Sequence, residues 1–92
     1  MIEIVFEPER SRSAAYDDGK EIGECVFSPS DTVWIISHTF VTDEYGGQGI
    51  AAKLVEKVVE EARNKGMKII PLCSFAKREF QEKPEYQDVL RK

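Results

Sequence analysis

The 92-residue sequence has few residues that form disulfides or bind metals: two cysteines, Cys25 and Cys73, and one histidine. Two cysteines are too few for a disulfide framework, so we expect reduced thiols, and no paired Cys/His spacing indicates zinc. No apolar run approaches the length of a membrane span, and the N-terminus lacks the basic flank and apolar core of a signal peptide. These absences predict a cytoplasmic protein with no metal and no membrane partner.

The charge balance is slightly acidic. A formal net charge of −4 argues against a protein that binds duplex nucleic acid, although it is compatible with a local basic patch. A content of 41% hydrophobic and 33% charged residues is typical of a globular chain rather than a disordered one. The length predicts one domain, residues 1–92, with a modest core. The sequence indicates no particular oligomeric state.

The β-rich segments predict five strands, at residues 2–6, 11–16, 21–28, 32–41 and 67–73. The first four follow one another as an antiparallel meander. Residues 32–41 are apolar on both faces, which is typical of a central strand, and we expect Val33 and Ile35 to pack in the core. The aromatic residues expected in the core are Phe6, Phe27 and Trp34.

Residues 48–65 have the periodicity of an amphipathic helix, with Ile50, Leu54, Val58 and Ala62 recurring every four residues. Gly66 is the expected C-terminal cap. One helix between two strands favours a parallel, right-handed crossover. The predicted fold class is therefore α/β (α+β), a mostly antiparallel sheet with one parallel strand–helix–strand unit.

Two short helices are predicted after the last strand. Ser74 is the expected cap of the first, which runs to about Phe80. Pro84 is expected to open the second, over residues 85–90.

The junction between the fourth strand and the long helix is dense in glycine, at Gly46, Gly47 and Gly49. Glycines let the chain turn its N–H groups outward, and the helix start adds unpaired N–H groups and the positive end of its dipole. One interpretation of the junction is therefore a phosphate or pyrophosphate site. The alternative is a tight connection that needs glycine only for its geometry. The residues fit neither the Rossmann fingerprint, since no acidic ribose-binding residue follows on the next strand, nor the Walker A loop, since Gly-Lys-Ser/Thr is absent.

This junction resembles the acetyl-CoA loop of the GNAT superfamily of N-acetyltransferases, whose pattern is Gln/Arg-x-x-Gly-x-Gly/Ala. Gly49 and Ala51 match its last two specified positions, and Gly46 stands where Gln or Arg is usual. The segments at residues 36–41 (Ile-Ser-His-Thr-Phe-Val), 70–74 (Ile-Pro-Leu-Cys-Ser) and 83–86 (Lys-Pro-Glu-Tyr) extend the likeness. Together they are similar to a small stand-alone branch of GNAT-like candidate acetyltransferases with His-Thr, Gly-Gln-Gly and Pro-x-Cys-Ser motifs.

The sequence also departs from that branch. Phe75-Ala76 stands where a Tyr-Val pair is usual, and Lys83 stands where a His often precedes the Pro-Glu-Tyr.

The resemblance implies acetyl-CoA as cosubstrate and no metal. In such folds the strands on either side of the long helix splay apart, the pantetheine arm lies in the gap, and the pyrophosphate rests on the loop, here residues 46–51. The implied cofactor-binding residues are Phe40, Val41, Thr42, Gly46, Gly47, Gln48, Gly49, Ile50, Ala51 and Ser74.

His38 and Cys73 are the candidate catalytic residues. An imidazole with a reference pKa near 6.5 suits proton transfer at neutral pH. The resemblance places Cys73 beside the gap, where a thiol is either a transient nucleophile or the acid that protonates the leaving thiolate. Because both belong to strands that are neighbours before they splay, we expect their side chains to approach one another. The alternatives are a structural histidine and a buried, inert thiol, and Cys25 is expected only to fill space.

The predicted function is acetyl-CoA-dependent N-acetyl transfer to an amine, of a small molecule or a protein, whose identity the sequence does not indicate. The alternative is a non-catalytic CoA- or acyl-CoA-binding module on the same fold. A third alternative is an unrelated phosphate-binding module.

Overall fold

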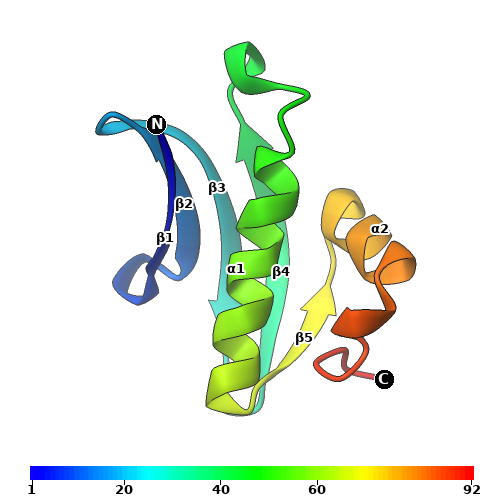
Figure 1. Cartoon of the computed structure of the whole chain (residues 1–92). Coiled ribbons are helices and arrows are strands. Elements are labelled where there is room, and N and C mark those ends of the chain that lie inside the picture. The colour runs from blue at the N-terminus through cyan, green and yellow to red at the C-terminus, as the bar shows by residue number, and fades with distance from the viewer.

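One five-stranded sheet, in the order β1-β2-β3-β4-β5, organises the computed structural model, which describes residues 1–92 (Figure 1). The strands are β1 (Ile2–Glu7), β2 (Arg12–Asp17), β3 (Lys20–Pro29), β4 (Val33–Val41) and β5 (Lys68–Pro71). Pairing is antiparallel from β1 to β4 and parallel between β4 and β5. The predicted α/β class and the parallel unit are confirmed. The long apolar strand β4 lies fourth in the sheet, however, and not at its centre.

Helix α1 (Ile50–Lys65) crosses one face of the sheet and contacts all five strands (Figure 1). Its four-residue apolar repeat faces inward and is buried, as predicted. Phe27 and Trp34 join the same core and stack with ring centroids 4.3 Å apart, and half-buried Phe6 stacks on both. The aromatic residues are therefore core residues, as expected.

An irregularity in β4 decides which residues face the helix. Val26 pairs with His38 but Phe27 pairs with Ile36, so Ser37 is an extra residue that forms a β-bulge. Before the bulge, Trp34 and Ile36 are buried in the core. A regular strand would keep alternate residues on one face, and the bulge shifts that alternation by one position.

The expected place of Val33 and Ile35 was wrong. Both are only half-buried and lie outside the core, because the alternation that buries Trp34 and Ile36 turns their odd-numbered neighbours to the other face.

The C-terminal part begins with α2 (Ser74–Glu82), which packs against α1, β4 and β5. Its N-cap is Cys73 rather than the expected Ser74: the Cys73 Sγ accepts a hydrogen bond from the Ala76 N–H at 3.4 Å. The second predicted helix is a single 3₁₀ turn, Pro84–Tyr86.

The chain leaves this turn to run beside β5, which explains why the helix stops. The Ile69 N–H donates to the Val89 carbonyl at 2.6 Å, and the Arg91 N–H donates to the Ile69 carbonyl at 2.9 Å. Backbone groups that pair with a strand are not free to continue a helix.

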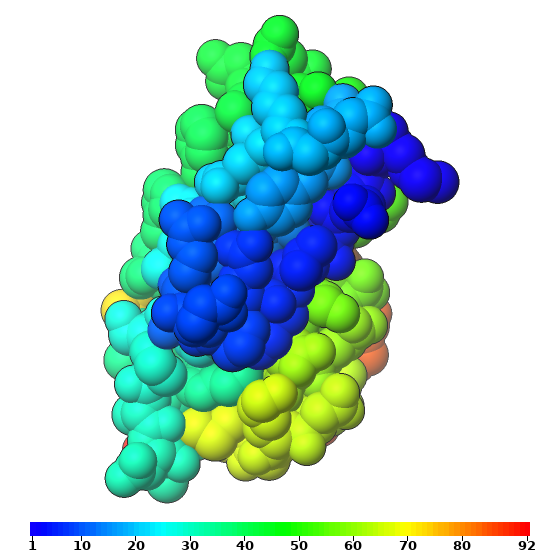
Figure 2. All heavy atoms as spheres, turned by 90° about the vertical axis from the view of Figure 1, so that its left-hand side faces the viewer, coloured from blue at the N-terminus to red at the C-terminus, as the bar shows by residue number.

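The connection between β4 and α1 projects at one end of the molecule. It contains a 3₁₀ turn, Asp43–Tyr45, and then the glycine-rich residues. Figure 2 shows it in green beyond the blue N-terminal strands, and its residues 46–49 are exposed.

Candidate functional site

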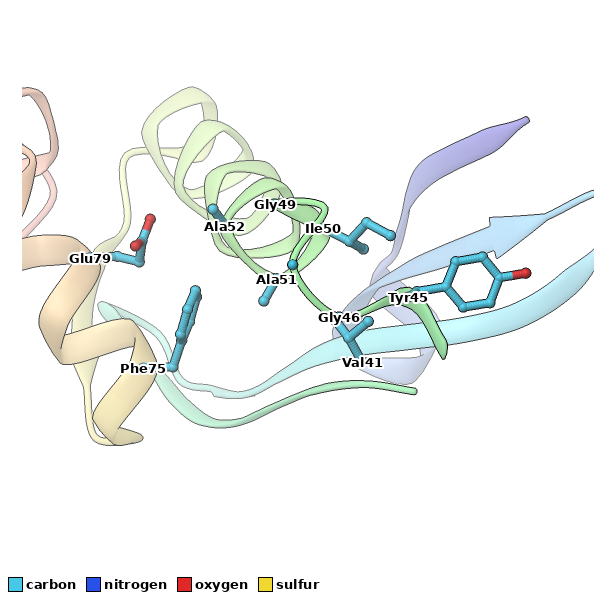
Figure 3. A pocket seen from close by; sticks show the side chains of 10 residues that line it. Val41, Tyr45, Gly46, Gly49, Ile50, Ala51, Ala52, Phe75 and Glu79 are labelled. Carbon is cyan, nitrogen blue, oxygen red and sulfur yellow. The ribbon is translucent and has the colours of Figure 1, made fainter. Parts of the chain in front are cut away.

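A cavity of about 330 Å³ lies between the end of β4, the glycine loop, the first turn of α1 and helix α2. In Figure 3 the Phe75 and Glu79 side chains project from α2 toward the start of α1. The lining residues are Val41, Tyr45, Gly46, Gly47, Gly49, Ile50, Ala51, Ala52, Phe75 and Glu79. The end of β4, the loop and the start of α1 supply glycine backbone, two alanines and the larger side chains of Val41, Tyr45 and Ile50, and α2 supplies an aromatic ring and a carboxylate.

The backbone N–H groups of residues 47–52 have no acceptor within the chain. Lys53 is the first residue of the helix whose N–H is bonded, to the Gly49 carbonyl at 3.2 Å. No side chain caps the helix start, and its first turn contains no acidic residue. Unpaired N–H groups at the positive end of a helix dipole form an anion-binding surface.

Two glycines shape this surface. Gly47 and Gly49 have φ angles of +79° and +77°, in the left-handed region that disfavours a side chain. Gly46 has φ −63° and does not need to be glycine for its backbone angles. The sequence reasoning that gave all three glycines one role is therefore wrong for Gly46.

The carboxylate in the cavity wall is neutralised by a neighbour. Glu79 is buried and accepts a hydrogen bond from the Lys83 Nζ at 2.6 Å, and this bond raises the pKa of the Lys83 ammonium. The pair lets α2 border an anion-binding surface without an isolated negative charge facing it.

The cavity lies beside a gap in the sheet. β5 pairs with β4 only along Val33–Ile36, after which the N–H groups of Leu72 and Cys73 both donate to the Ile36 carbonyl as the chain turns into α2. β4 continues to Val41 paired only with β3. The Thr42 N–H donates to Ile22 of β3 at 2.9 Å, so by alternation the N–H groups of Val41 and Thr39 point toward the gap.

His38 lies on the face of the sheet that α1 does not cover, which is here called the open face. Its Nε2 is 3.7 Å from the Glu24 Oε2, its ring stacks on Phe40, and the side chain is 55% exposed. The other Glu24 oxygen accepts a 2.7 Å hydrogen bond from Arg12, which is itself buried. The histidine therefore has a carboxylate neighbour that the sequence did not reveal.

Cys73 lies on the other side of β4. The Thr39 hydroxyl stands between two thiols, 3.4 Å from the Cys73 Sγ and 3.6 Å from the Cys25 Sγ. Because consecutive residues of a strand face opposite ways, His38 and Thr39 point to opposite faces. The expected approach of His38 to Cys73 is therefore wrong: the imidazole lies against Glu24 and the thiol against Thr39.

The match to known proteins extends over most of the chain. The sequence model of the GCN5-related N-acetyl-transferase family matches residues 12–89. The chain belongs to this family. No curated protein sequence matches it.

Solved structures agree with the family assignment. The chain is similar to the solution structure of a GCN5-like candidate N-acetyltransferase from Staphylococcus aureus, with 37% identity, a TM-score of 0.75, and coverage of 97% of this chain and 87% of that one. A GNAT family acetyltransferase from Elizabethkingia anophelis with acetyl-CoA bound shares 24% identity at a TM-score of 0.61, over 78% of this chain and 52% of that one. N-acetylglutamate synthase from Neisseria gonorrhoeae, complexed with coenzyme A and N-acetyl-glutamate, shares 17% identity at a TM-score of 0.66. The match covers 86% of this chain and 21% of that one.

These three matches differ in reach. The chain spans most of the staphylococcal protein but only about half of the second structure and a fifth of the third. At 24% and 17% identity, the last two show a common fold.

Within this GNAT fold, the cofactor-binding residues expected from the sequence divide into two groups. Those that line the cavity are Val41, Gly46, Gly47, Gly49, Ile50 and Ala51; those that do not are Phe40, Thr42, Gln48 and Ser74. Phe40 is half-exposed, and the Thr42 hydroxyl is buried without a hydrogen-bond partner. Cys25 is fully buried in the core, and burial raises the pKa of its thiol to about 12.

Five residues at the site were not predicted from the sequence: Tyr45, Ala52, Phe75 and Glu79, which line the cavity, and Thr39, which contacts both thiols. The spacing of Phe75 and Glu79, four residues apart on a short helix, was the available signal, since it puts both on one face. No group of three or more His, Cys, Asp or Glu side chains is placed to hold a metal ion. None of the helices is long and apolar enough to cross a membrane.

Proposed function

We propose that this GNAT family chain is an acetyl-CoA-dependent N-acetyltransferase that moves an acetyl group to an amine. The observation that carries the proposal is the row of unpaired N–H groups at residues 47–52, which borders a cavity at the mouth of the β4–β5 gap. A pyrophosphate is the ligand group that such a row suits, because each phosphate oxygen can accept several N–H bonds next to the helix dipole.

The residues around the cavity suit the rest of the cofactor. Added β-carbons at Gly47 and Gly49 would meet nothing within 4 Å, so the loop leaves room for phosphates against its backbone. The free N–H groups of Thr39 and Val41 suit the amides of a pantetheine arm, as an added strand would, and Phe75 supplies an apolar wall. When bound, acetyl-CoA supplies an activated thioester.

The two candidate catalytic residues would act from opposite faces of the sheet. His38, on the open face, would take the proton that the acceptor amine must lose, and Glu24 would stabilise the resulting imidazolium. Cys73, on the side of α1 and the loop, would either protonate the departing thiolate or carry the acetyl group transiently. This division needs no contact between the two side chains.

Binding and turnover test the proposal in that order. Saturating CoA and acetyl-CoA should raise the melting temperature, whereas ATP at the same concentration should raise it less, since ATP has no arm to occupy the gap. A screen of small amines and amine-bearing peptides should then detect acetyl-CoA turnover.

With an acceptor in hand, His38→Ala should lower kcat by roughly 10²–10⁴ while the affinity for acetyl-CoA is retained, as for a lost general base. Full turnover in both His38→Ala and Cys73→Ala would contradict the catalytic assignment and return both residues to structural roles.

A second candidate function is a CoA- or acyl-CoA-binding module without catalysis. The separation of His38 from Cys73 by the strand between them favours it, because no preformed catalytic pair exists. Tight CoA binding together with no acetylated product from any amine would support this function over the first.

A further inference from the structure

The Thr39 hydroxyl has one hydrogen but two sulfur neighbours. It is within hydrogen-bond distance of both thiols, 3.6 Å from the Cys25 Sγ and 3.4 Å from the Cys73 Sγ. A threonine hydroxyl donates one hydrogen and accepts at its oxygen. It can therefore donate to only one of the two sulfurs at a time.

The contact between Thr39 and Cys73 allows either atom to be the donor, and one arrangement satisfies every contact when all three groups are protonated. Thr39 donates to the Cys25 Sγ, and the Cys73 S–H donates to the Thr39 oxygen. The Ala76 N–H donates to the Cys73 Sγ at 3.4 Å, from the first turn of α2. The hydrogen bonds thus run in one direction, from Ala76 through Cys73 and Thr39 to Cys25.

Loss of the Cys73 proton reverses the hydrogen bond between Cys73 and Thr39 and releases the one from Thr39 to Cys25. A thiolate cannot donate, so the Thr39 oxygen loses its donor, and its own hydrogen can turn about the Cβ–Oγ1 bond toward the charged sulfur. No heavy atom needs to move. The bond that Thr39 gives up is to a neutral thiol, a weak acceptor, and the bond that it gains is to an anion, a stronger one.

We propose that Thr39 is a positioning residue for Cys73, whose hydroxyl accepts from the thiol and donates to the thiolate. Together with the Ala76 N–H it gives the charged sulfur two donors. This holds whether Cys73 attacks the acetyl group or gives its proton to the leaving thiolate. Cys25 serves as the resting acceptor and remains a thiol, because burial raises its pKa to about 12.

The catalytic purpose of Cys73 rests on the proposed function, but the contact between Thr39 and Cys73 does not. The test of this contact needs no acceptor amine. Iodoacetamide alkylates thiolates: the sulfur forms an S–C bond, iodide leaves, and the thiol proton has already passed to the buffer. The rate at Cys73, read from the mass of its peptide, reports how well the surroundings support the charged sulfur. Peptide mapping also separates Cys73 from Cys25.

Two variants separate the hydroxyl from its packing. Thr39→Val keeps the branched shape and removes the hydroxyl, and should slow labelling of Cys73 at pH 7 roughly tenfold, the scale of a hydrogen bond to a charged group. Thr39→Ser keeps the hydroxyl and should label at close to the original rate. Thr32→Val, at an exposed position, is the control for a threonine-to-valine change elsewhere. Melting curves confirm that each variant is folded.

Equal labelling rates for folded Thr39→Val and the unchanged protein would overturn the proposal. So would slow labelling of Thr39→Ser with normal labelling of Thr39→Val, which would assign the effect to packing. If Thr39→Val is unfolded, Thr39→Ala and Thr39→Ser provide the same comparison.

A parallel arm with saturating CoA keeps the two proposals distinguishable. Slow labelling of Thr39→Val without protection by CoA would support the role of Thr39 and contradict the cofactor site. Protection by CoA with equal labelling rates would support the cofactor site and overturn the role of Thr39.

Discussion

The two ends of helix α1 are built in opposite ways. At the C-terminal end the Gly66 N–H donates to the Arg63 carbonyl at 3.3 Å and the Met67 N–H donates to the Ala62 carbonyl at 2.8 Å, the Schellman arrangement with glycine in the left-handed region. Basic residues in the last turn complement the dipole. The N-terminal end has no side-chain cap and no acidic residue, and the N–H groups of residues 47–52 have no partner in the chain.

This difference separates stability from binding within one helix. The capped end uses its polar groups within the chain, and these stabilise the fold. The open end leaves its donors unpaired within the chain, and those of residues 47–49 belong to exposed residues, so they remain available to an anion. Changes at the capped end should therefore affect unfolding, and changes at the open end should affect ligand binding.

The middle of helix α1 packs in the core between the two ends, so a substitution there should have the largest effect on stability. Leu54 is fully buried, and its carbonyl accepts a 2.8 Å hydrogen bond from Ser13 of β2. Leu54→Ala should lower the free energy of unfolding by about 2–5 kcal/mol, measured by urea denaturation. Exposed Glu60→Ala is the control, with an expected change within about 0.5 kcal/mol. A loss for Leu54→Ala of less than about 1 kcal/mol would contradict the helix packing described above.

The cap at Gly66 should have an intermediate effect. Its φ of +72° is strained for any residue with a β-carbon, although an added β-carbon would meet nothing within 4 Å. Gly66→Ala should therefore lower the free energy of unfolding by about 1 kcal/mol. Calorimetry should find its CoA affinity unchanged, and weakened binding would show that the two ends are not independent.

The smallest effect should come from the ion pair at the capped end. Arg63 donates to both Asp88 carboxylate oxygens, at 2.7 and 2.9 Å, and the hydrogen bond lowers the pKa of the Asp88 carboxyl. A lowered pKa adds stability above the usual carboxyl range and loses it as the pH falls through the folded value. Arg63→Gln should thus lower the urea midpoint slightly at pH 7 and not at pH 2. A difference that persists unchanged at pH 2 would mean that this pair does not cause it.

Local sequence patterns predicted most of the fold because local chemistry determines those elements. Prediction of α1 required only the four-residue spacing of its apolar residues, and prediction of its end required only the backbone angles that the following glycine allows. The β-bulge at Ser37 depends on how β3 pairs with β4, which no local pattern records. Residues 32–41 are apolar on both faces, so the pattern does not show which face packs on the helix, and Val33 and Ile35 were wrongly expected in the core. The last turn at Pro84 ended early because the following residues pair with β5, again a non-local cause.

The candidate site divides in the same way. The loop was predictable, since its glycines and the helix after it are continuous in sequence. The surroundings of the thiol were not, because Cys25, Thr39 and Cys73 come from three separate segments that the fold brings together. Glu24 beside His38 also depends on strand register rather than on any motif.

One pair of variants tests the central claim, that the open end of α1 binds the pyrophosphate of CoA. Gly49→Asp and Gly66→Asp make the same change at opposite ends of the helix, at φ angles of +77° and +72°, where an added β-carbon meets nothing within 4 Å. Asp tolerates this backbone region better than most residues, so both variants should fold. Titration calorimetry with CoA should show binding lost in Gly49→Asp, whose carboxylate repels the phosphates and competes for their N–H donors, and retained in Gly66→Asp. Unchanged affinity in a folded Gly49→Asp protein would contradict the account.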